Sequence, residues 1–460
     1  MSKKSVRATS IVTLVLVLAA LACGKGTTET PAKAPPAPTH TQAPGTAAKA
    51  TPTRPPAKPA ATNTIPPTPT LEPEPVTVIA SGHGQIDQWL GVAFIVTNPN
   101  ADLAIERTQY QIAVYDQSKA VVKTDSGYIE VLMPSQTLGV AARFTLSEDV
   151  QAAHVEVQLS QGKPTAAEAM PDFGVSNVTF RLGDLGSEAR GIISNPLDID
   201  LRNLRICAIA YDQAGEIVGG GWAFLSFVLA QGEAGVEVPL TSASEVTRVD
   251  LYPGFLSLST VTRETEMPAD AARPVLVKSG IGQNDDEVGY GLLVKNPNEG
   301  YAIENTSLHF TIYDADGHVM IVHEGSIPVL LPGETQGIAG VFYGQAFQIA
   351  DRLDVQLLPG TYTPSAAIPS LSAENVSYQA DSYTAKTTGM IVNPYDKEVS
   401  HVGVCAIAYD SAGEIVGGGV TRMDFVPAGG KAAVEVTTVS AGTPASVELY
   451  ASVTQLSAIK

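Results

Sequence analysis

The chain has 460 residues, of which 44% are hydrophobic and only 16% charged, with 41 Gly and 32 Pro. Its formal net charge of −19 argues against the basic surface that nucleic-acid binding requires. No apolar run reaches the roughly 18 residues that a permanent transmembrane helix needs.

The first 22 residues have the pattern of a signal peptide. Three basic residues precede an apolar run at 11–22, which suits a signal-peptide core and is too short to span a bilayer. The run ends in small residues before Cys23, and this end resembles the lipobox of bacterial lipoproteins. The resemblance implies acylation of Cys23 and anchoring at the extracytoplasmic face of a bacterial membrane. The alternative is an ordinary signal peptide followed by an incidental cysteine.

Residues 23–75 form the next part, in which Cys23 is followed by 52 residues with 14 Pro, 12 Thr and 10 Ala. Only Ile65 and Leu71 are large and apolar, so burial cannot offset the entropy lost on ordering. We therefore expect a disordered, semi-extended stalk. It would lift the rest of the chain off the membrane, or act as a passive spacer.

The remainder repeats at an interval of 198 residues. Asn98-Pro99 recurs as Asn296-Pro297, and Cys207 recurs as Cys405. Each repeat unit contains two similar parts, so we expect four tandem domains of about 90 residues in a duplicated two-domain unit. The predicted segments are A (76–161), B (172–262), A′ (274–359) and B′ (370–460). Residues 76–460 carry a net charge of −24.

Apolar residues in the four segments recur with a period of two. Tyr110, Ile112 and Val114 alternate with more polar neighbours, which is the pattern of a half-buried strand. Short strands with frequent turn signals are typical of β-sandwiches. The sequence predicts an all-β protein whose sandwich domains follow the signal peptide and the disordered Pro/Thr-rich linker.

Each segment also carries a strand that ends in Tyr-Asp. The four dipeptides are Tyr115-Asp116, Tyr211-Asp212, Tyr313-Asp314 and Tyr409-Asp410. With the upstream Asn-Pro, these stretches resemble FxLYD domains, which are small bacterial modules. The resemblance implies an immunoglobulin-like sandwich and an extracytoplasmic module without a general catalytic role, and it carries over no site residues.

The aspartates of these dipeptides are expected to open hairpin turns. In three copies a glycine follows at the third position and would take the left-handed conformation. Segment A has Lys119 there, so its turn is expected to differ. A calcium loop at Asp314 is the rival interpretation, but the remaining ligands of an EF-hand are missing. No metal site is predicted.

The B segments differ from the A segments on one strand face. The face that is polar in A is apolar in B and B′, and it forms our candidate interface. Its residues are Cys207, Ile209, Tyr211, Cys405, Ile407 and Tyr409. A strand that is apolar on both faces is usually covered on both. The cover could be a loop or strand of the same segment, an A segment of the same chain, or a protein partner.

The two segment cysteines are expected to be buried free thiols, with an intermolecular disulfide as the alternative. The triplet Gly219–Gly221 is expected to lie in a bulged or edge strand, because no phosphate-loop residues follow it. The sequence contains no nucleophile or zinc motif, so we expect neither catalytic residues nor a cofactor.

The sequence thus predicts a membrane-anchored bacterial surface lipoprotein with a non-catalytic role in protein binding or assembly. The protein partner is unidentified. The alternatives are a carbohydrate- or cell-wall-binding module and a passive structural spacer. Exposed apolar faces on the B segments would favour a protein partner, and aromatic residues gathered at one loop end would favour a glycan.

Overall fold

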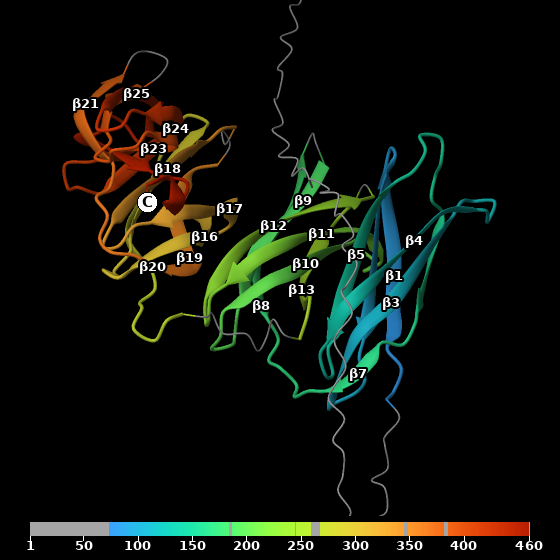
Figure 1. Ribbon diagram of the computed structural model, residues 1–460. Coiled ribbons are helices and arrows are strands. Elements are labelled where there is room, and N and C mark those ends of the chain that lie inside the picture. The colour runs from blue at the N-terminus through green and yellow to red at the C-terminus, as the bar shows by residue number, and fades with distance from the viewer. Residues whose placement is uncertain are drawn as a thin grey trace, which may run out of the picture. The chain divides into compact units, whose positions relative to one another are not determined.

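A computed structural model provides the structure of the chain (Figure 1). It describes residues 73–183, 186–243, 245–258, 267–344, 348–380 and 385–459. The predicted signal peptide (1–22), Cys23 and residues 24–72 of the predicted stalk lie outside these described residues.

The described part of the chain is all-β, as predicted. Its strands form several antiparallel sheets, and its one short helical turn is η1 (Leu456–Ala458). In the described residues no helix is long and apolar enough to cross a membrane. The predicted fold class of β-sandwich architecture is confirmed.

Segment A contains two sheets, with strand orders β1-β2-β5 and β4-β3-β6. The last strand, β7, pairs with the first residues of β3 and lies beyond the predicted segment boundary at residue 161. The strands are β1 (Thr77–Ile86), β2 (Trp89–Thr97), β3 (Leu103–Tyr115), β4 (Val121–Leu132), β5 (Thr137–Thr145), β6 (His154–Leu159) and β7 (Lys163–Ala166).

Segment A′ repeats this arrangement, with sheets β14-β15-β18 and β17-β16-β19. Its last strand, β20, pairs with β16 in the same way and lies beyond residue 359. The strands are β14 (Val275–Asn284), β15 (Glu287–Lys295), β16 (Tyr301–Asp314), β17 (Val319–Leu330), β18 (Thr335–Phe342), β19 (Ala350–Leu358) and β20 (Thr361–Pro364).

In segment B one continuous path of strands, β13-β10-β11-β12-β9-β8, joins both sheets. Strand β12 makes the link, because most of it pairs with β9 while its last residues pair with β11. The strands are β8 (Gly174–Gly183), β9 (Gly186–Ser194), β10 (Leu201–Tyr211), β11 (Ile217–Val228), β12 (Glu233–Ser242) and β13 (Arg248–Phe255).

Segment B′ has the same strands in two separate sheets, β21-β22-β25 and β26-β24-β23-β27, because the linking strand is interrupted at Thr438. The strands are β21 (Ser372–Ala380), β22 (Ala385–Val392), β23 (Val399–Tyr409), β24 (Ile415–Val426), β25 (Lys431–Thr437), β26 (Val439–Ser440) and β27 (Ser446–Ser452). Most strands of A and B recur in A′ and B′ at an offset of 198 residues, which confirms the repeat.

Each of the four largest apolar clusters is centred on one segment, and those of B and B′ also include residues of A and A′, such as Met133 and Leu331. Their side chains come from the alternate positions that the period-two pattern marks, and Ile112, Ile206 and Val404 are fully buried. Burial of such side chains stabilises each cluster by about 1.5–3 kcal/mol per large aliphatic residue. The alternating residues of the predicted strand, Tyr110, Ile112 and Val114, are all buried, which confirms that core face.

The asparagine side chains of the Asn-Pro dipeptides are buried and form hydrogen bonds with backbone groups from separate parts of each segment. The Asn98 amide donates to the carbonyls of Leu103 and Met133 at 2.8 Å, and its oxygen accepts the N–H of Asn100. Asn195, Asn296 and Asn393 make the corresponding bonds. This amide satisfies carbonyls that would otherwise be buried without partners. The asparagine of the dipeptide therefore holds two backbone segments together, in addition to marking a turn.

The four Tyr-Asp aspartates open hairpin turns, as predicted. In each copy Oδ1 accepts the backbone N–H four residues ahead, at 2.8–2.9 Å. The prediction that segment A would differ is wrong: Lys119 adopts a left-handed φ of 65°, beside 83° at Gly215. The bonds that Asp116 accepts from Ala120 and Ser118 hold the lysine in this less favourable conformation.

Candidate functional site: the joints between segments

The candidate interface of segment B is covered by segment A. Ile209 is fully buried, and Cys207 and Tyr211 are each 4% exposed. They belong to a small apolar cluster that includes Ala93 of β2 and Ala141 of β5. Of the covers that the sequence left open, the structure therefore shows an A segment of the same chain. We call this contact the A/B joint.

Segment A′ covers segment B′ in the same way. Ile407 is fully buried and Tyr409 nearly so, in a cluster with Ala339 of β18. Cys405 is half-buried, and its sulfur lies 3.9 Å from the Ala339 carbonyl oxygen. This A′/B′ joint repeats the A/B joint, so neither candidate face is free for a partner.

Glycines allow the sheets to approach closely at both joints. A Cβ on Gly82 or Gly84 of β1 would lie within 3.0 Å of the backbone of β11, and one on Gly91 of β2 would meet the Thr241 carbonyl. Gly280, Gly282 and Gly289 occupy the corresponding places 198 residues later. The backbone of β1 and β2 therefore packs directly on the backbone of segment B, and a residue with a side chain would not allow the two to come so close.

The predicted glycine triplet belongs to the same joint. The β10–β11 register shifts between Ala210 and Tyr211, opposite Gly219, which has a φ of 157°. The expected bulge is present, but β11 is an interior strand. A Cβ on Gly219 would collide with the Thr241 carbonyl of β12 within segment B, and one on Gly220 would lie 2.8 Å from the Ala93 Cβ of segment A. These glycines therefore allow close packing both within segment B and at the joint.

Burial makes the cysteines and tyrosines of the joints unreactive at neutral pH. Burial raises the pKa of the Cys207 thiol, and it raises that of Cys405 to about 11. Few thiolates are present at neutral pH, which argues against a nucleophilic role. The Tyr211 hydroxyl lies 3.1 Å from that of Tyr252 on the neighbouring strand.

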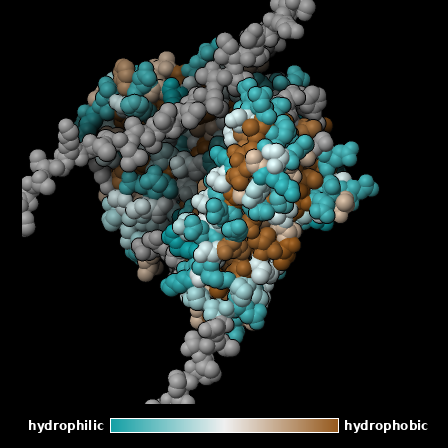
Figure 2. Space-filling view, turned by 90° about the vertical axis from the view of Figure 1, so that its right-hand side faces the viewer, coloured by the Kyte–Doolittle hydropathy of each residue, from teal (hydrophilic) through white to brown (hydrophobic). Residues whose placement is uncertain are grey.

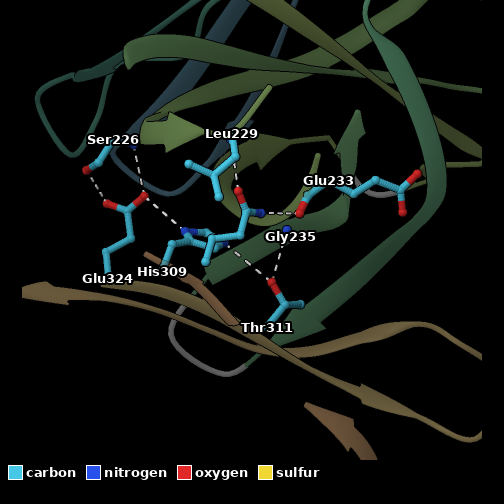
Figure 3. A network of polar contacts seen from close by, with 8 residues as sticks. Ser226, Leu229, Glu233, Gly235, His309, Thr311 and Glu324 are labelled. Atoms are coloured by element: carbon cyan, nitrogen blue, oxygen red, sulfur yellow. Dashed lines mark hydrogen bonds and ion pairs between the residues drawn. The ribbon is translucent and has the colours of Figure 1, made fainter. Parts of the chain in front are cut away.

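The junction between segments B and A′ is of a different kind, because polar side chains occupy its centre (Figure 3). His309 of β16 is 1% exposed. Its Nδ1 lies 3.4 Å from a Glu324 carboxylate oxygen, and its Nε2 lies 3.4 Å from the Thr311 hydroxyl. From segment B, the Ser226 N–H donates to Glu324 at 2.9 Å and the Gly235 N–H donates to Thr311 at 3.0 Å.

Further contacts tie the same two segments. The Leu229 N–H donates to the Gln356 side chain at 2.9 Å, and Arg190 donates to the Met320 carbonyl. Arg190 also forms ion pairs with Glu188 and Glu237 within segment B. A small apolar cluster of Ile192, Tyr313, Val319 and Val322 completes the B/A′ joint.

The surroundings of Glu324 in this joint stabilise its charged carboxylate form. Burial alone would raise the pKa of Glu324, but the hydrogen bonds from His309 and Ser226 and the charge of His309 hold it below its usual value. The carboxylate form is therefore the one that fits the joint.

The B/A′ chemistry is specific to one place in the array. Segment A has Gln111 where A′ has His309, and Ser126 where A′ has Glu324. Gln111 is exposed, whereas His309 is buried. His309 is a site residue that the sequence did not predict. It stands four residues before the tyrosine of its Tyr-Asp dipeptide, as Cys207 and Cys405 do, and this position faces out of its own sandwich.

Asp314, Asp316 and His318 form the one group in the described residues whose ligand atoms lie within 4.8 Å of one another. Asp314 Oδ1 is already used by the backbone N–H groups of Asp316 and His318, as in the other hairpin turns. The group is accounted for by the turn, which agrees with the hairpin interpretation.

Beyond the joints, apolar residues lie among polar ones on the surface (Figure 2). Trp89, Leu182 and Ile349 are 48%, 71% and 79% exposed. Scattered exposed apolar residues are normal in soluble proteins. The sequence suggested that exposed apolar faces on B and B′ would favour a protein partner. Segments A and A′ cover those faces, so they give no support for such a partner.

Comparison with known proteins assigns no family. No family model and no curated protein matches the chain. Among solved structures it has a distant similarity to the crystal structure of dimeric latent PorU from Porphyromonas gingivalis, with 10% sequence identity and a TM-score of 0.13. The similarity covers 82% of this chain and 33% of PorU, so the chain spans about a third of that protein's length.

Proposed function

We propose that this chain is a lipid-anchored bacterial surface lipoprotein with a non-catalytic role in protein binding or assembly. Cys23 would carry the lipid, residues 24–75 would form the stalk, and the FxLYD-like segments would form the extracytoplasmic body. The acidic character of residues 76–460 supports a body that stays soluble and avoids anionic lipid.

The observation that carries the proposal is the way in which the segments are fixed to one another. The A/B and A′/B′ joints use glycines so that whole sheets pack together, and the B/A′ joint adds a buried polar network. Such joints restrict motion between neighbouring segments more than flexible linkers would. This arrangement suits a protein that presents a surface in a fixed geometry.

The anchoring step is tested by Cys23→Ser. The wild-type chain is expected in the membrane fraction, and the variant in the medium or the periplasm, because a serine cannot accept the thioether-linked lipid that holds the protein. Immunoblotting of fractionated cells measures the change, and Cys405→Ser is the matched control that should stay in the membrane. A Cys23→Ser variant that remains in the membrane fraction would contradict lipid anchoring.

The binding step is tested by crosslinking the native protein in cells and identifying co-purified proteins by mass spectrometry. One stoichiometric protein partner supports an assembly role. Absence of any protein partner contradicts that role and favours the glycan-binding or spacer alternative, which a glycan array with the full-length chain then separates.

A further inference from the structure

A cavity of about 270 Å³ lies where segments A and B meet. Segment A contributes residues of β3, β4 and β5, and segment B contributes residues of β10, β11 and β13. Its wall is mainly apolar and includes five aromatic residues: Tyr110, Tyr128, Phe224, Tyr252 and Phe255. Cavities at domain interfaces, lined by aromatic side chains with few polar groups, are typical of small-molecule sites.

One cation lines this cavity. The Arg205 guanidinium lies 4.6 Å from the centre of the Trp222 ring, and its Nη2 donates to the Ala141 carbonyl at 2.9 Å. Its Nε is buried without a hydrogen-bond partner among the described residues, and no described carboxylate lies within 4.0 Å of the group. Glu130 also lines the cavity but forms no ion pair with Arg205. The Tyr110 hydroxyl and the Cys207 thiol are its other polar neighbours. Neither group is an anion, so the guanidinium retains the capacity to bind a carboxylate.

The second copy of the joint shows that this chemistry is not needed for joining two segments. At the offset of 198 residues, Gly403 replaces Arg205 and Val420 replaces Trp222. Leu308 and Ser326 replace Tyr110 and Tyr128. The glycine contacts of the joint are kept in both copies, whereas Arg205 and most of the aromatic wall occur in the first copy alone. Of the wall residues, Tyr252 recurs as Tyr450, and Arg422 stands in the place of Phe224.

We infer that the A/B joint binds a small monocarboxylate with an aromatic or alkyl body. The carboxylate would pair with the Arg205 guanidinium, and the apolar body would lie among Tyr110, Tyr128 and Phe224. A cavity of about 150 Å³ holds a benzene molecule, so 270 Å³ accommodates a ring with a short acid side chain. The inference goes beyond the proposed anchoring and assembly role and does not depend on it.

The test uses the full-length chain with Cys23→Ser and Trp89→Phe, which leaves Trp222 as the only tryptophan. Its emission is titrated with 3-phenylpropionate, with the neutral amide of that acid, and with octanoate. Saturable binding of an acid is expected, and binding of the amide and binding by Arg205→Met should be weaker by about tenfold or more, because each lacks one partner of the charge pair.

Arg248→Met is the matched control. Like Arg205, Arg248 stacks on an aromatic ring, that of Tyr211, but it pairs with Asp250 and does not line the cavity. It should bind the acid like the parent chain. Tyr128→Ser, which introduces the residue of the second copy at a half-exposed position, should bind several-fold more weakly and replaces Arg205→Met if that variant does not fold. Equal binding of acid and amide, undiminished binding by a folded Arg205→Met or Tyr128→Ser, or no saturation below about 1 mM would each overturn the inference.

Discussion

Replacing Gly84 with alanine is expected to open the A/B joint and to make Cys207 react about 10- to 100-fold faster with a thiol reagent. The added Cβ would lie within 3.0 Å of the Val218 carbonyl oxygen and the Ala243 amide nitrogen. Both are backbone atoms, which cannot rotate away as a side chain can. Overpacking of this kind destabilises by about 1–3 kcal/mol, which corresponds to the expected change in rate.

Cys207 is a direct reporter of this joint, since segment A covers it. In the wild type both segment thiols should react slowly, because a thiol with a pKa near 11 has about 100-fold fewer thiolates at pH 8 than one at 9. A Cys23→Ser background leaves Cys207 and Cys405 as the only thiols. Peptide mapping after timed labelling then assigns each rate to its cysteine.

The repeat supplies the matched variants. Gly282→Ala makes the same change in the A′/B′ joint, so it should expose Cys405 and leave Cys207 slow. Gly300→Ala is the neutral control, because an added Cβ there meets no atom within 4 Å. Slow labelling of Cys207 in Gly84→Ala would contradict the role of glycine at the joint, and equal acceleration of both cysteines would contradict independent joints.

Much of this fold is readable in the sequence because the determining signals are local. Alternating apolar residues identify β10 and its core face, and Asp212 with Gly215 identifies the following turn. Duplication adds weight, because the same signals recur 198 residues later. Lys119 shows the limit of a residue rule, since neighbouring hydrogen bonds impose a left-handed conformation that its own preference disfavours.

The identity of the cover over Cys207 and Ile209 was not readable in the same way. Their apolar character indicates burial, but it does not say which surface does the burying. The complementary signal lies more than 100 residues away, in glycines such as Gly84 and Gly91 that look like ordinary turn formers in a chain with 41 glycines. Only the packing shows that these two sets of residues meet.

The buried state of His309 was equally hidden, because a polar residue on an outward strand face is normally solvated. Segment B makes the difference by placing Ser226 and Gly235 N–H groups against A′ side chains. A polar joint of this kind depends on hydrogen bonds that are satisfied only when both segments are in place.

Replacing Glu324 with glutamine is therefore expected to loosen the B/A′ joint and to leave the other two joints intact. Glutamine keeps one acceptor oxygen but loses the charge that supports the bonds from Ser226 and His309. Charge-assisted hydrogen bonds contribute about 1.5–3 kcal/mol, and partial exposure to solvent reduces this to about 1–2 kcal/mol here.

Hydrogen–deuterium exchange reads this change directly. The N–H groups of Ser226, Leu229 and Gly235 belong to segment B but donate to side chains of A′. Peptides spanning residues 224–236 should exchange roughly 5- to 30-fold faster in Glu324→Gln, which is the kinetic equivalent of about 1–2 kcal/mol. Glu435→Gln, which removes a surface carboxylate paired with Lys386, should change nothing in these peptides.

Acid should loosen the B/A′ joint of the wild type as Glu324→Gln does, because the lowered pKa of Glu324 means that protonation destabilises the joint. Because the joint holds the pKa of Glu324 below its usual value, the carboxylate stabilises the folded joint fully above that usual value. The contribution is lost as the pH falls through the lowered pKa. Wild-type protection of residues 224–236, corrected for intrinsic exchange, should therefore approach that of Glu324→Gln at acid pH. If the difference between the two proteins persists unchanged below the pKa of Glu324, the carboxylate does not hold the joint through its charge.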